Sequence, residues 1–368
     1  MKRHKQKSVF IFSITRTVIF IVLAFLCLIT IPFKNQIETL INVGYTNNNA
    51  QLDEQGLQVH FVNVGQGDGI LIELPDGKTM IIDAGPSGNA PRLIDYIENN
   101  IFEKTTEKVF DYMIITHSDT DHIGAADEIL DEYQVNNVYR PEIFATYNNL
   151  ETVEVGQSGV DTQTYAKVIE RVLSEPFCNI VFNIEGITIT GGVDDDEYVF
   201  TFYSPNESYY SDVNKFSPII VLEYKNKRIM LTGDATIENE QQVLQNFTLP
   251  QVDVLKLGHH GSNTSTSSEL LAQINITYAV VSAGKNNSYG HPHQETINRL
   301  IYSGVSENNI FNTSVNGNIL ANITTSGYLH IFTDVESLPI YIEWEYVVLG
   351  SIIILFYLSF TLKIKEIN

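Results

Sequence analysis

The stretch Thr116-His117-Ser118-Asp119-Thr120-Asp121-His122-Ile123-Gly124 places two imidazoles and two carboxylates within six residues. It directly follows the apolar run 112–115, which predicts a short buried strand that ends in a turn. Burying so many polar and charged groups is costly unless a cation gathers them. Histidine nitrogen and aspartate oxygen, without cysteine, suit Zn²⁺, Mn²⁺ or Fe. The alternative is a hydrogen-bonded turn that caps the helix expected after it, since Asp and Ser commonly cap helices.

The formal charge of the 368-residue chain is distributed unevenly. Residues 1–33 carry five basic and no acidic residues, whereas residues 34–340 hold 15 basic and 41 acidic residues, a net charge of -26. A region this acidic repels polyanions, so the sequence shows no basic footprint for extended nucleic-acid binding. With only two cysteines, Cys27 and Cys178, a disulfide framework is excluded.

Apolar segments near both ends predict two membrane spans. Residues 18–33 are apolar apart from Thr30 and follow a basic head, so we expect a cytoplasmic head and a transmembrane helix within 1–33. A cleavable signal peptide is the alternative for this segment. Residues 346–362 follow two aromatic residues and precede two lysines, which predicts a second transmembrane helix within 342–362, with a buried C-terminal helix as the alternative.

Basic residues lie at the terminal side of both predicted spans, so the positive-inside rule places both termini in the cytoplasm. The acidic region between the spans then faces outward. The sequence therefore predicts a two-pass protein of the cell membrane that displays an extracellular domain. Residues 34–56 are polar and irregular and are expected to form a membrane-proximal linker.

The region from residue 57 to residue 335 is expected to form a single α/β domain. Periodicity and turn signals predict strands and helices in two successive strand-rich halves, each covered by helices, which is typical of a four-layer sandwich. In the first half the expected strands are 57–63, 70–74, 79–82, 109–115 and 135–139, and the expected helices are 89–100, 124–134 and 162–175. In the second half the expected strands are 180–184, 187–190, 198–203, 219–224, 228–231, 252–257 and 277–282, the expected helices are 237–245 and 293–304, and a closing hairpin lies near 310–333.

Further chemically active residues follow predicted strands in this domain. A carboxylate ends the third strand at Asp83, and another, Asp234, ends the strand that finishes in Leu231-Thr232-Gly233. Two histidines occur in Gly258-His259-His260-Gly261-Ser262, and His291 lies in a later loop.

The order of these motifs resembles the metallo-β-lactamase superfamily. More narrowly, it is similar to the extracellular metallo-hydrolase domain of ComEC-type competence proteins. The phrases that carry the resemblance are residues 59–68 (VHFVNVGQGD), 116–124, 231–235 (LTGDA), 254–262 (VLKLGHHGS) and 282–292 (SAGKNNSYGHP). The resemblance covers roughly residues 57–333 and implies an αββα sandwich that binds one or two divalent metal ions, chiefly Zn²⁺.

The resemblance also implies roles for individual residues. Four residues match the first metal-binding run of the family: His117, Asp119, Asp121 and His122. Asp234 matches the carboxylate that bridges or closes the second metal, and Asp83 matches a strand-end Asp that orients ligands from behind. Spacing beyond Asp234 leaves three candidates for the last ligand, namely His259, His260 and His291.

The chain departs from the superfamily pattern at two places. Most members have His at the third position of the first run, where this chain and the ComEC-like group have Asp119. Most members also have another His before the Gly-Asp motif, but no His occurs between His122 and His259. The first metal site is therefore incomplete, weaker, or filled by His259 or His260. Because ComEC proteins pair this domain with a many-helix channel, two spans alone do not imply DNA uptake.

The predicted activity is hydrolysis by metal-bound hydroxide, since divalent ions lower the pKa of bound water towards about 7. Asp121 or Asp119 is expected to accept a proton, and His259 or His260 to protonate the leaving oxygen. The expected substrate is a phosphodiester, in nucleic acid or in a cell-wall polymer, and the net charge of -26 favours a small or wall-bound one over long DNA. We expect Lys256 and Lys285 to be solvated side chains near the cleft.

Two other functions remain open on the sequence alone. The same fold hydrolyses other esters, amides or lactones, which only a substrate panel separates from phosphodiesters. A surface binding module with a decayed, metal-poor site belongs to a different class, and the metal content of the purified protein distinguishes it. Intact His117, Asp121, His122 and Asp234 argue against the binding module.

Overall fold

The structure is a computed structural model that describes residues 51–103, 105–141, 143, 163–181, 184–204, 210 and 212–334. These residues belong to one compact unit, Ala50–Glu336. The two segments predicted to span the membrane and most of the predicted linker lie outside the described residues. Within the described part, no helix is both long and apolar enough to cross a bilayer.

The described residues form two β-sheets that pack against each other. The first has the strand order β15-β14-β1-β2-β3-β4-β5-β6, and the second has the order β13-β12-β11-β10-β9-β8-β7. The strands of the first sheet are β1 (Leu57–Phe61), β2 (Ile70–Glu73), β3 (Thr79–Ile82), β4 (Val109–Ile114), β5 (Gln134–Tyr139), β6 (Asn179–Val181), β14 (Ile319–Ile323) and β15 (Leu329–Thr333). Those of the second sheet are β7 (Thr188–Gly191), β8 (Tyr198–Tyr203), β9 (Ile219–Tyr224), β10 (Lys227–Leu231), β11 (Val254–Lys256), β12 (Tyr278–Val281) and β13 (Ile310–Asn312).

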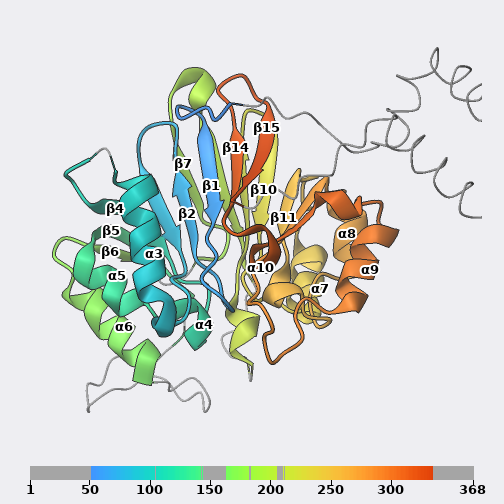
Figure 1. The fold of residues 1–368 in the computed structure, drawn as a ribbon, viewed down its shortest axis with the longest axis horizontal. Helices are drawn as coiled ribbons and strands as arrows, with labels where there is room; N and C mark the ends of the chain where they lie inside the picture. Colours follow the sequence, from blue (N-terminus) through green and yellow to red (C-terminus); the bar gives the residue numbers. More distant parts are fainter. Residues whose placement is uncertain are drawn as a thin grey trace, which may run out of the picture. The chain divides into compact units, whose positions relative to one another are not determined.

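Helices cover the outer face of each sheet (Figure 1). On the first sheet lie α3 (Ala90–Tyr96), α4 (Thr120–Ile123), α5 (Ala126–Glu132) and α6 (Gln163–Ser174). On the second sheet lie α7 (Ile237–Asn246), α8 (Ser268–Ile274) and α9 (Gln294–Tyr302). A short helix, α10 (Thr313–Asn316), follows β13.

Side-chain alternation along the strands explains the layers. On β9, Ile220, Leu222 and Tyr224 point into the apolar core between the two sheets, whereas Ile219 and Val221 pack under the helices of the second sheet. Both faces of this strand are therefore buried, as expected for a strand in the middle of a four-layer sandwich. The two-sheet α/β sandwich predicted from the sequence is confirmed.

Two of the predicted strand assignments are wrong in sheet membership or extent. The predicted strand 180–184 was expected in the second sheet, but β6 pairs in parallel with β5 at the edge of the first sheet. The crossover through α6 returns the chain beside β5, which is the usual path of a βαβ unit. The closing hairpin expected near 310–333 is present but shorter: β14 and β15 pair antiparallel and extend the first sheet beside β1, whereas β13 pairs with β12 in the second sheet.

The site residues lie where parallel strands end. Asp83 and Thr116 follow β3 and β4, which are parallel neighbours, while Asp234 and His259 follow β10 and β11, which are parallel neighbours in the other sheet. The carboxyl ends of parallel strands are the usual positions for ligand sites in α/β proteins. The two sheets thus bring segments from both halves of the chain to one edge of the sandwich.

Candidate metal centre

The motif 116–124 links β4 to α4. His117 and Ser118 lie buried in the connection, and α4 begins at Thr120, so that His122 occupies its last turn. The His122 Nδ1 atom is 2.7 Å from Asp83 Oδ2, and Asp83 also accepts hydrogen bonds from Thr116 N (2.9 Å) and Thr116 Oγ1 (2.6 Å). These contacts fix the ring of His122 and direct its Nε2 atom away from Asp83.

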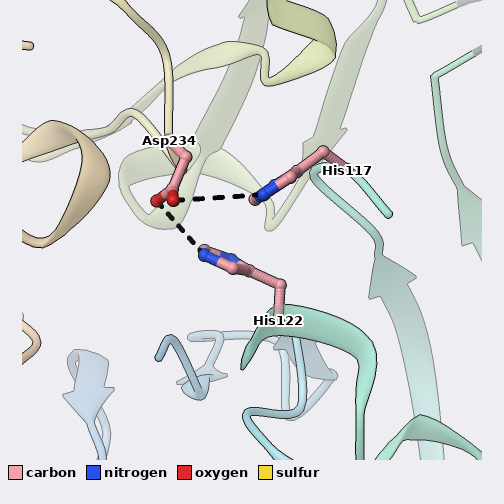
Figure 2. A group of neighbouring side chains, drawn as sticks. All are labelled: His117, His122 and Asp234. Atoms are coloured by element: carbon pink, nitrogen blue, oxygen red, sulfur yellow. Dashed lines mark ion pairs between the residues drawn. The ribbon is translucent and has the colours of Figure 1, made fainter. Parts of the chain in front are cut away.

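Two imidazoles converge on Asp234 (Figure 2). The His122 Nε2 atom lies 3.2 Å from Asp234 Oδ1, and the His117 Nε2 atom lies 4.0 Å from Asp234 Oδ2. All three side chains are buried, and one donor atom from each lies within 4.8 Å of the others. The backbone N–H of Asp234 donates to Ser217 Oγ (3.1 Å), which holds the carboxylate in the site.

A second donor set shares His122 with the first. The His260 Nε2 atom lies 3.2 Å from Asp121 Oδ2, 3.3 Å from His122 Nε2 and 3.5 Å from Asp234 Oδ2. The His260 Nδ1 atom is 2.8 Å from the carbonyl oxygen of Ser282, so that nitrogen carries the proton and donates it. The Nε2 atom of neutral His260 is then a lone-pair donor that faces the site.

The donor atoms are suited to a divalent cation. Among the buried polar atoms of the described residues, His117 Nε2 and Asp234 Oδ1 have no hydrogen-bond partner. The nitrogens His122 Nε2 and His260 Nε2 face each other, and a proton or a metal ion between them removes the repulsion of their lone pairs. Nitrogen and carboxylate oxygen without thiolate are the ligands of Zn²⁺, Mn²⁺ and Fe sites. The residues present therefore fit the cation that the sequence predicted.

The pKa values of these groups show that positive charge close to the carboxylates is stabilised. Burial alone would lower the pKa of His260, but Asp234, Asp121 and Asp68 outweigh burial and raise it to about 9. Burial would raise the pKa of Asp234, but the charges of His122 and His260 hold that pKa well below its usual range. Protons on histidine balance the charge of these carboxylates, and a divalent cation would take the place of those protons on binding.

Backbone conformation at the site is costly at three positions. Asp83 (φ 56°), His259 (φ 47°) and His260 (φ 54°) are non-glycine residues in the left-handed region. Each costs about 1–2 kcal/mol relative to the right-handed helical conformation. Two such residues in succession form the turn after β11 that points both rings at the site, and strain of this kind is concentrated at functional positions.

Three of the predicted ligands lie at the rim. Among the described donor sets, none contains Asp119, His259 or His291. The Asp119 carboxylate lies 3.7 Å from His117 Nε2 with its side chain 42% exposed, and the His259 Nε2 atom lies 3.7 Å from Asp234 Oδ2. The ring of His291 lies 5.4 Å from that of His259 between centroids. Burial lowers the pKa of His259 and also lowers that of His291, to about 4, so both rings are neutral near pH 7.

Of the residues identified from the sequence, the structure brings together His117, Asp121, His122, Asp234 and His260, with Asp83 behind them. His259, one of the two histidines expected to fill the first metal site, lies beside Asp234. The three candidates for the last ligand differ in position: His260 is in a donor set, whereas His259 and His291 are beside it. Their roles as ligands remain predictions.

Sequence reasoning missed a buried ion pair beneath the site. Lys256 Nζ pairs with Asp68, and both side chains are buried, which corrects the expectation that Lys256 is solvated. The signal was available, because Lys256 stands inside a predicted buried strand of a sheet with helices on one face and a second sheet on the other. Asp68 ends the phrase 59–68 that carries the family resemblance, and nothing in its spacing predicts a lysine partner 188 positions away along the chain.

The fold and the donor set define a two-sheet α/β protein with a candidate metal site. Residues 62–285 match the metallo-β-lactamase superfamily domain, and the chain belongs to that superfamily. It is 28% identical over 274 residues to ComE operon protein 3 of Bacillus subtilis, an alignment that covers 71% of this chain and 32% of the relative. It is 30% identical over 275 residues to Recombination protein 2 of Haemophilus influenzae, covering 74% of this chain and 29% of the relative.

The chain thus spans about a third of the length of these curated relatives. Among solved structures, the metallo-β-lactamase fold protein YhfI from Bacillus subtilis matches with a TM-score of 0.43 and 10% identity, covering 75% of this chain and 100% of that one. The resemblance to the superfamily and to ComEC-type competence proteins that the sequence motifs indicated is confirmed.

Proposed function

We propose that this chain is a membrane-anchored, metal-dependent hydrolase that cleaves phosphodiesters outside the cell. The observation that carries the proposal is the convergence of His117, His122 and Asp234: His117 Nε2 is buried without a hydrogen-bond partner among the described residues, and the buried Asp234 Oδ1 atom lies 3.2 Å from His122 Nε2. Buried lone pairs that face one another are costly unless a cation occupies the space between them.

The residues divide into two ligand sets around Asp234. His117 and Asp234 would hold one ion with Asp119 or His259 at its open side, and Asp121, His122 and His260 would hold a second. The cofactor is one or two divalent ions, with Zn²⁺ first and Mn²⁺ or Fe as alternatives. When bound, such ions lower the pKa of water towards about 7 and polarise a phosphoryl oxygen.

The surrounding residues keep the donors oriented and move protons. Asp83 accepts the Nδ1–H of His122 and thereby fixes the tautomer that leaves Nε2 free. Of the two adjacent histidines, His259 is suited to proton transfer, because its side chain is 27% exposed and close to Asp234. His260 is less suited, since its Nδ1 atom is bound to Ser282 O and its Nε2 atom belongs to a donor set. Asp121 belongs to the same donor set, but its side chain is 31% exposed, so it is the carboxylate of that set from which we propose a proton can be exchanged with solvent or substrate.

A phosphodiester is the proposed substrate class because its phosphoryl oxygens bind divalent ions. The ions also supply the positive charge that an anionic substrate needs and that the acidic domain lacks. The name of one relative, Recombination protein 2, supports a substrate of this class. The net charge of -26 on residues 34–340 favours a small phosphodiester or a wall polymer over long DNA. The basic termini and apolar segments support anchoring by two spans with both termini in the cytoplasm.

The test is metal content and turnover of the purified full chain. We expect one or two divalent ions per chain and hydrolysis of bis-p-nitrophenyl phosphate, both lost in the Asp121→Ala/His122→Ala double variant. The matched control is Asp95→Ala/His330→Ala, which removes one carboxylate and one imidazole from other parts of the domain and retains both properties.

Metal without turnover of the phosphodiester, but with turnover of a carboxylic ester, amide or lactone in a parallel panel, would assign the same site to a different bond. Absence of both metal and turnover after Zn²⁺ or Mn²⁺ is supplied would reject the hydrolase and identify a surface binding module.

A further inference from the structure

A polar pocket opens beside the metal centre. Its volume is about 530 Å³, which lies within the range of small-molecule sites. It is formed by the loop between β12 and α9 together with the segment at β13 and α10, and the residues that line it are Gly284, Lys285, Asn286, Asn287, Gly290, His291, Pro292, Asn312, Ser314 and Val315. His291 joins the pocket to the centre, because its ring is 5.4 Å from the ring of His259 and 6.2 Å from that of His260.

The lining has the opposite electrostatic character to the rest of the chain. None of its residues is acidic, although the chain contains 44 Asp and Glu residues. Lys285 is exposed and makes no ion pair with any described residue, whereas Lys78, Lys108 and Lys227 each pair with a carboxylate. A free ammonium in a pocket without carboxylates favours an anionic ligand.

The pocket loop is held in shape by its own hydrogen bonds. Asn287 Nδ2 donates to Gly284 O (2.9 Å) and His291 O (2.6 Å), while Asn287 Oδ1 accepts from Tyr289 N (3.2 Å) and His291 N (3.0 Å). All the hydrogen-bonding capacity of this amide is therefore used within the loop. The loop backbone that carries Lys285 is therefore held in shape before any ligand arrives, which reduces the entropy lost on binding.

Donors in the pocket remain available for a ligand. The side chain of Asn286 and the Nδ2 atom of Asn312 have no hydrogen-bond partner among the described residues, whereas Asn312 Oδ1 accepts from Ser314 N. His291 Nδ1 is buried and has no partner either. An ammonium, two amides and an imidazole provide donors of the kind that bind phosphate oxygens.

We propose that this pocket binds a second phosphate of the substrate, carried on a sugar or polyol unit next to the scissile phosphodiester. The proposal rests on the proposed function, since it is the metal centre that fixes which bond is cut. Lys285 supplies the charge, and the volume accommodates the unit between the two phosphates. The exposed ring of Tyr289 lies outside the lining, but it stacks on the lining residue His291 at a centroid distance of 5.6 Å.

The kinetic test compares two p-nitrophenyl substrates that differ by one phosphate. These are thymidine 5′-(p-nitrophenyl phosphate) and the same compound with a 3′-phosphate. For the purified full chain we expect kcat/KM to be about tenfold higher for the second compound, which corresponds to about 1.4 kcal/mol. Lys285→Ala removes this preference and Lys285→Arg retains most of it.

The matched control is Lys167→Ala on α6. Lys167 is exposed and unpaired among the described residues, like Lys285, but lies in the helical layer of the other sheet. Its loss changes the net charge of the chain by the same amount and leaves the preference unchanged. Equal losses in the two variants would show that net charge, and not the pocket, is responsible, and would overturn the proposal, as would a wild type without any preference.

A binding measurement separates the failure of this proposal from that of the proposed function. Titration of the metal-stripped full chain with thymidine 3′,5′-bisphosphate is expected to show an affinity that falls about tenfold in Lys285→Ala and weakens with salt. Turnover of bis-p-nitrophenyl phosphate with no Lys285-dependent binding would reject the proposed phosphate-binding pocket and retain the proposed hydrolase activity. Lys285-dependent binding with no turnover of any phosphodiester would keep the anion site and reject the proposed phosphodiesterase activity.

Discussion

Lys256 and Asp68 form an ion pair in which both side chains are almost completely withdrawn from solvent, with exposed fractions of 0% and 1%. Lys256 Nζ also donates to the carbonyl oxygen of Gly233 at 3.3 Å, next to Asp234 in the chain. The backbone N–H of Asp68 donates to the carbonyl oxygen of Asp121 at 3.2 Å. The pair therefore connects the two segments that carry site carboxylates.

Replacing Lys256 with Met is expected to destabilise the domain strongly. Burial favours the neutral form of Asp68, but Lys256 and His260 keep its pKa below the usual range, so the carboxylate is charged in the folded protein. A charge left buried without its partner costs about 3–5 kcal/mol. Urea unfolding of the full chain, followed by circular dichroism, measures this loss, and the Lys256→Met/Asp68→Asn double variant is expected to recover part of it.

The control for this effect is a more exposed pair in the same sheet. Lys227 Nζ lies 2.8 Å from Asp253 Oδ1 with side chains that are 33% and 23% exposed. Lys227→Met is expected to cost about 0–1 kcal/mol, because solvent screens the charges. Similar losses for Lys256→Met and Lys227→Met would contradict the buried character of the first pair.

Metal ions are expected to stabilise the folded domain through the donor sets around Asp234. A ligand present at about 100 times its Kd that binds only the folded state adds about 2.7 kcal/mol to the free energy of unfolding. In Asp234→Ala we expect the Zn²⁺-dependent increment to vanish, whereas in His330→Ala, a change on β15, it persists. The comparison uses the increment and not the absolute stability, so a general destabilisation by Asp234→Ala does not affect it. An unchanged increment in Asp234→Ala would place the metal elsewhere.

The fold was largely predictable because its signals are local. The apolar run before His117 and the alternation in β9 predict strands without knowledge of their partners. The sheet to which β6 belongs was harder to predict, because β6 is three residues long and both sheets have an edge that it could join. The edge that β6 joins follows from the crossover through α6 and not from its own residues.

The site was predictable in its ligand types but not in its geometry. His117, Asp121 and His122 lie in a single turn, so their spacing in the sequence indicates that they are close. His260 lies 138 positions from His122, and its contact with His122 depends on the tertiary fold. The left-handed conformation of His259 and His260 has no sequence signal, since glycine, which favours this conformation, is absent at both positions.

Gly67→Ala is expected to disturb the site through the backbone of Asp121. Gly67 has φ 135°, a conformation almost restricted to glycine, and a Cβ atom there would collide with the carbonyl oxygen of Asp121. Strain and displacement together are expected to cost about 3 kcal/mol and to weaken metal binding by moving Asp121. Urea unfolding and a Zn²⁺ titration of the full chain measure the two effects.

Gly77→Ala separates conformational strain from collision. Gly77 also has a positive φ, 79°, but a Cβ atom there meets nothing within 4 Å. Its replacement is expected to cost about 1–2 kcal/mol with no change in metal affinity. Weakened metal binding in Gly77→Ala, or unaltered binding in Gly67→Ala, would exclude the contact with Asp121 as the cause.

Glu128 on α5 is expected to make stability depend on pH. Burial first, and then the neighbouring Asp127 and Asp131, raise the pKa of Glu128 from 4.5 to about 7, and its Oε2 atom is buried without a hydrogen-bond partner. Between these two pH values the folded state binds more protons than the unfolded state, so the free energy of unfolding falls as pH rises. Glu128→Gln has no ionisable group at this position, so the fall in the free energy of unfolding that Glu128 causes as pH rises is expected to be absent in the variant.

Urea midpoints of the metal-free full chain, measured at several pH values from about 4 to about 8, test this linkage. The difference in stability between Glu128→Gln and wild type is expected to grow in favour of the variant as pH rises through the window and then to level off above it. Glu269→Gln, an exposed change on α8, is the matched control and should follow the wild-type curve. A constant difference across the whole range would mean that Glu128 titrates alike in the folded and unfolded states, and the raised pKa would be wrong.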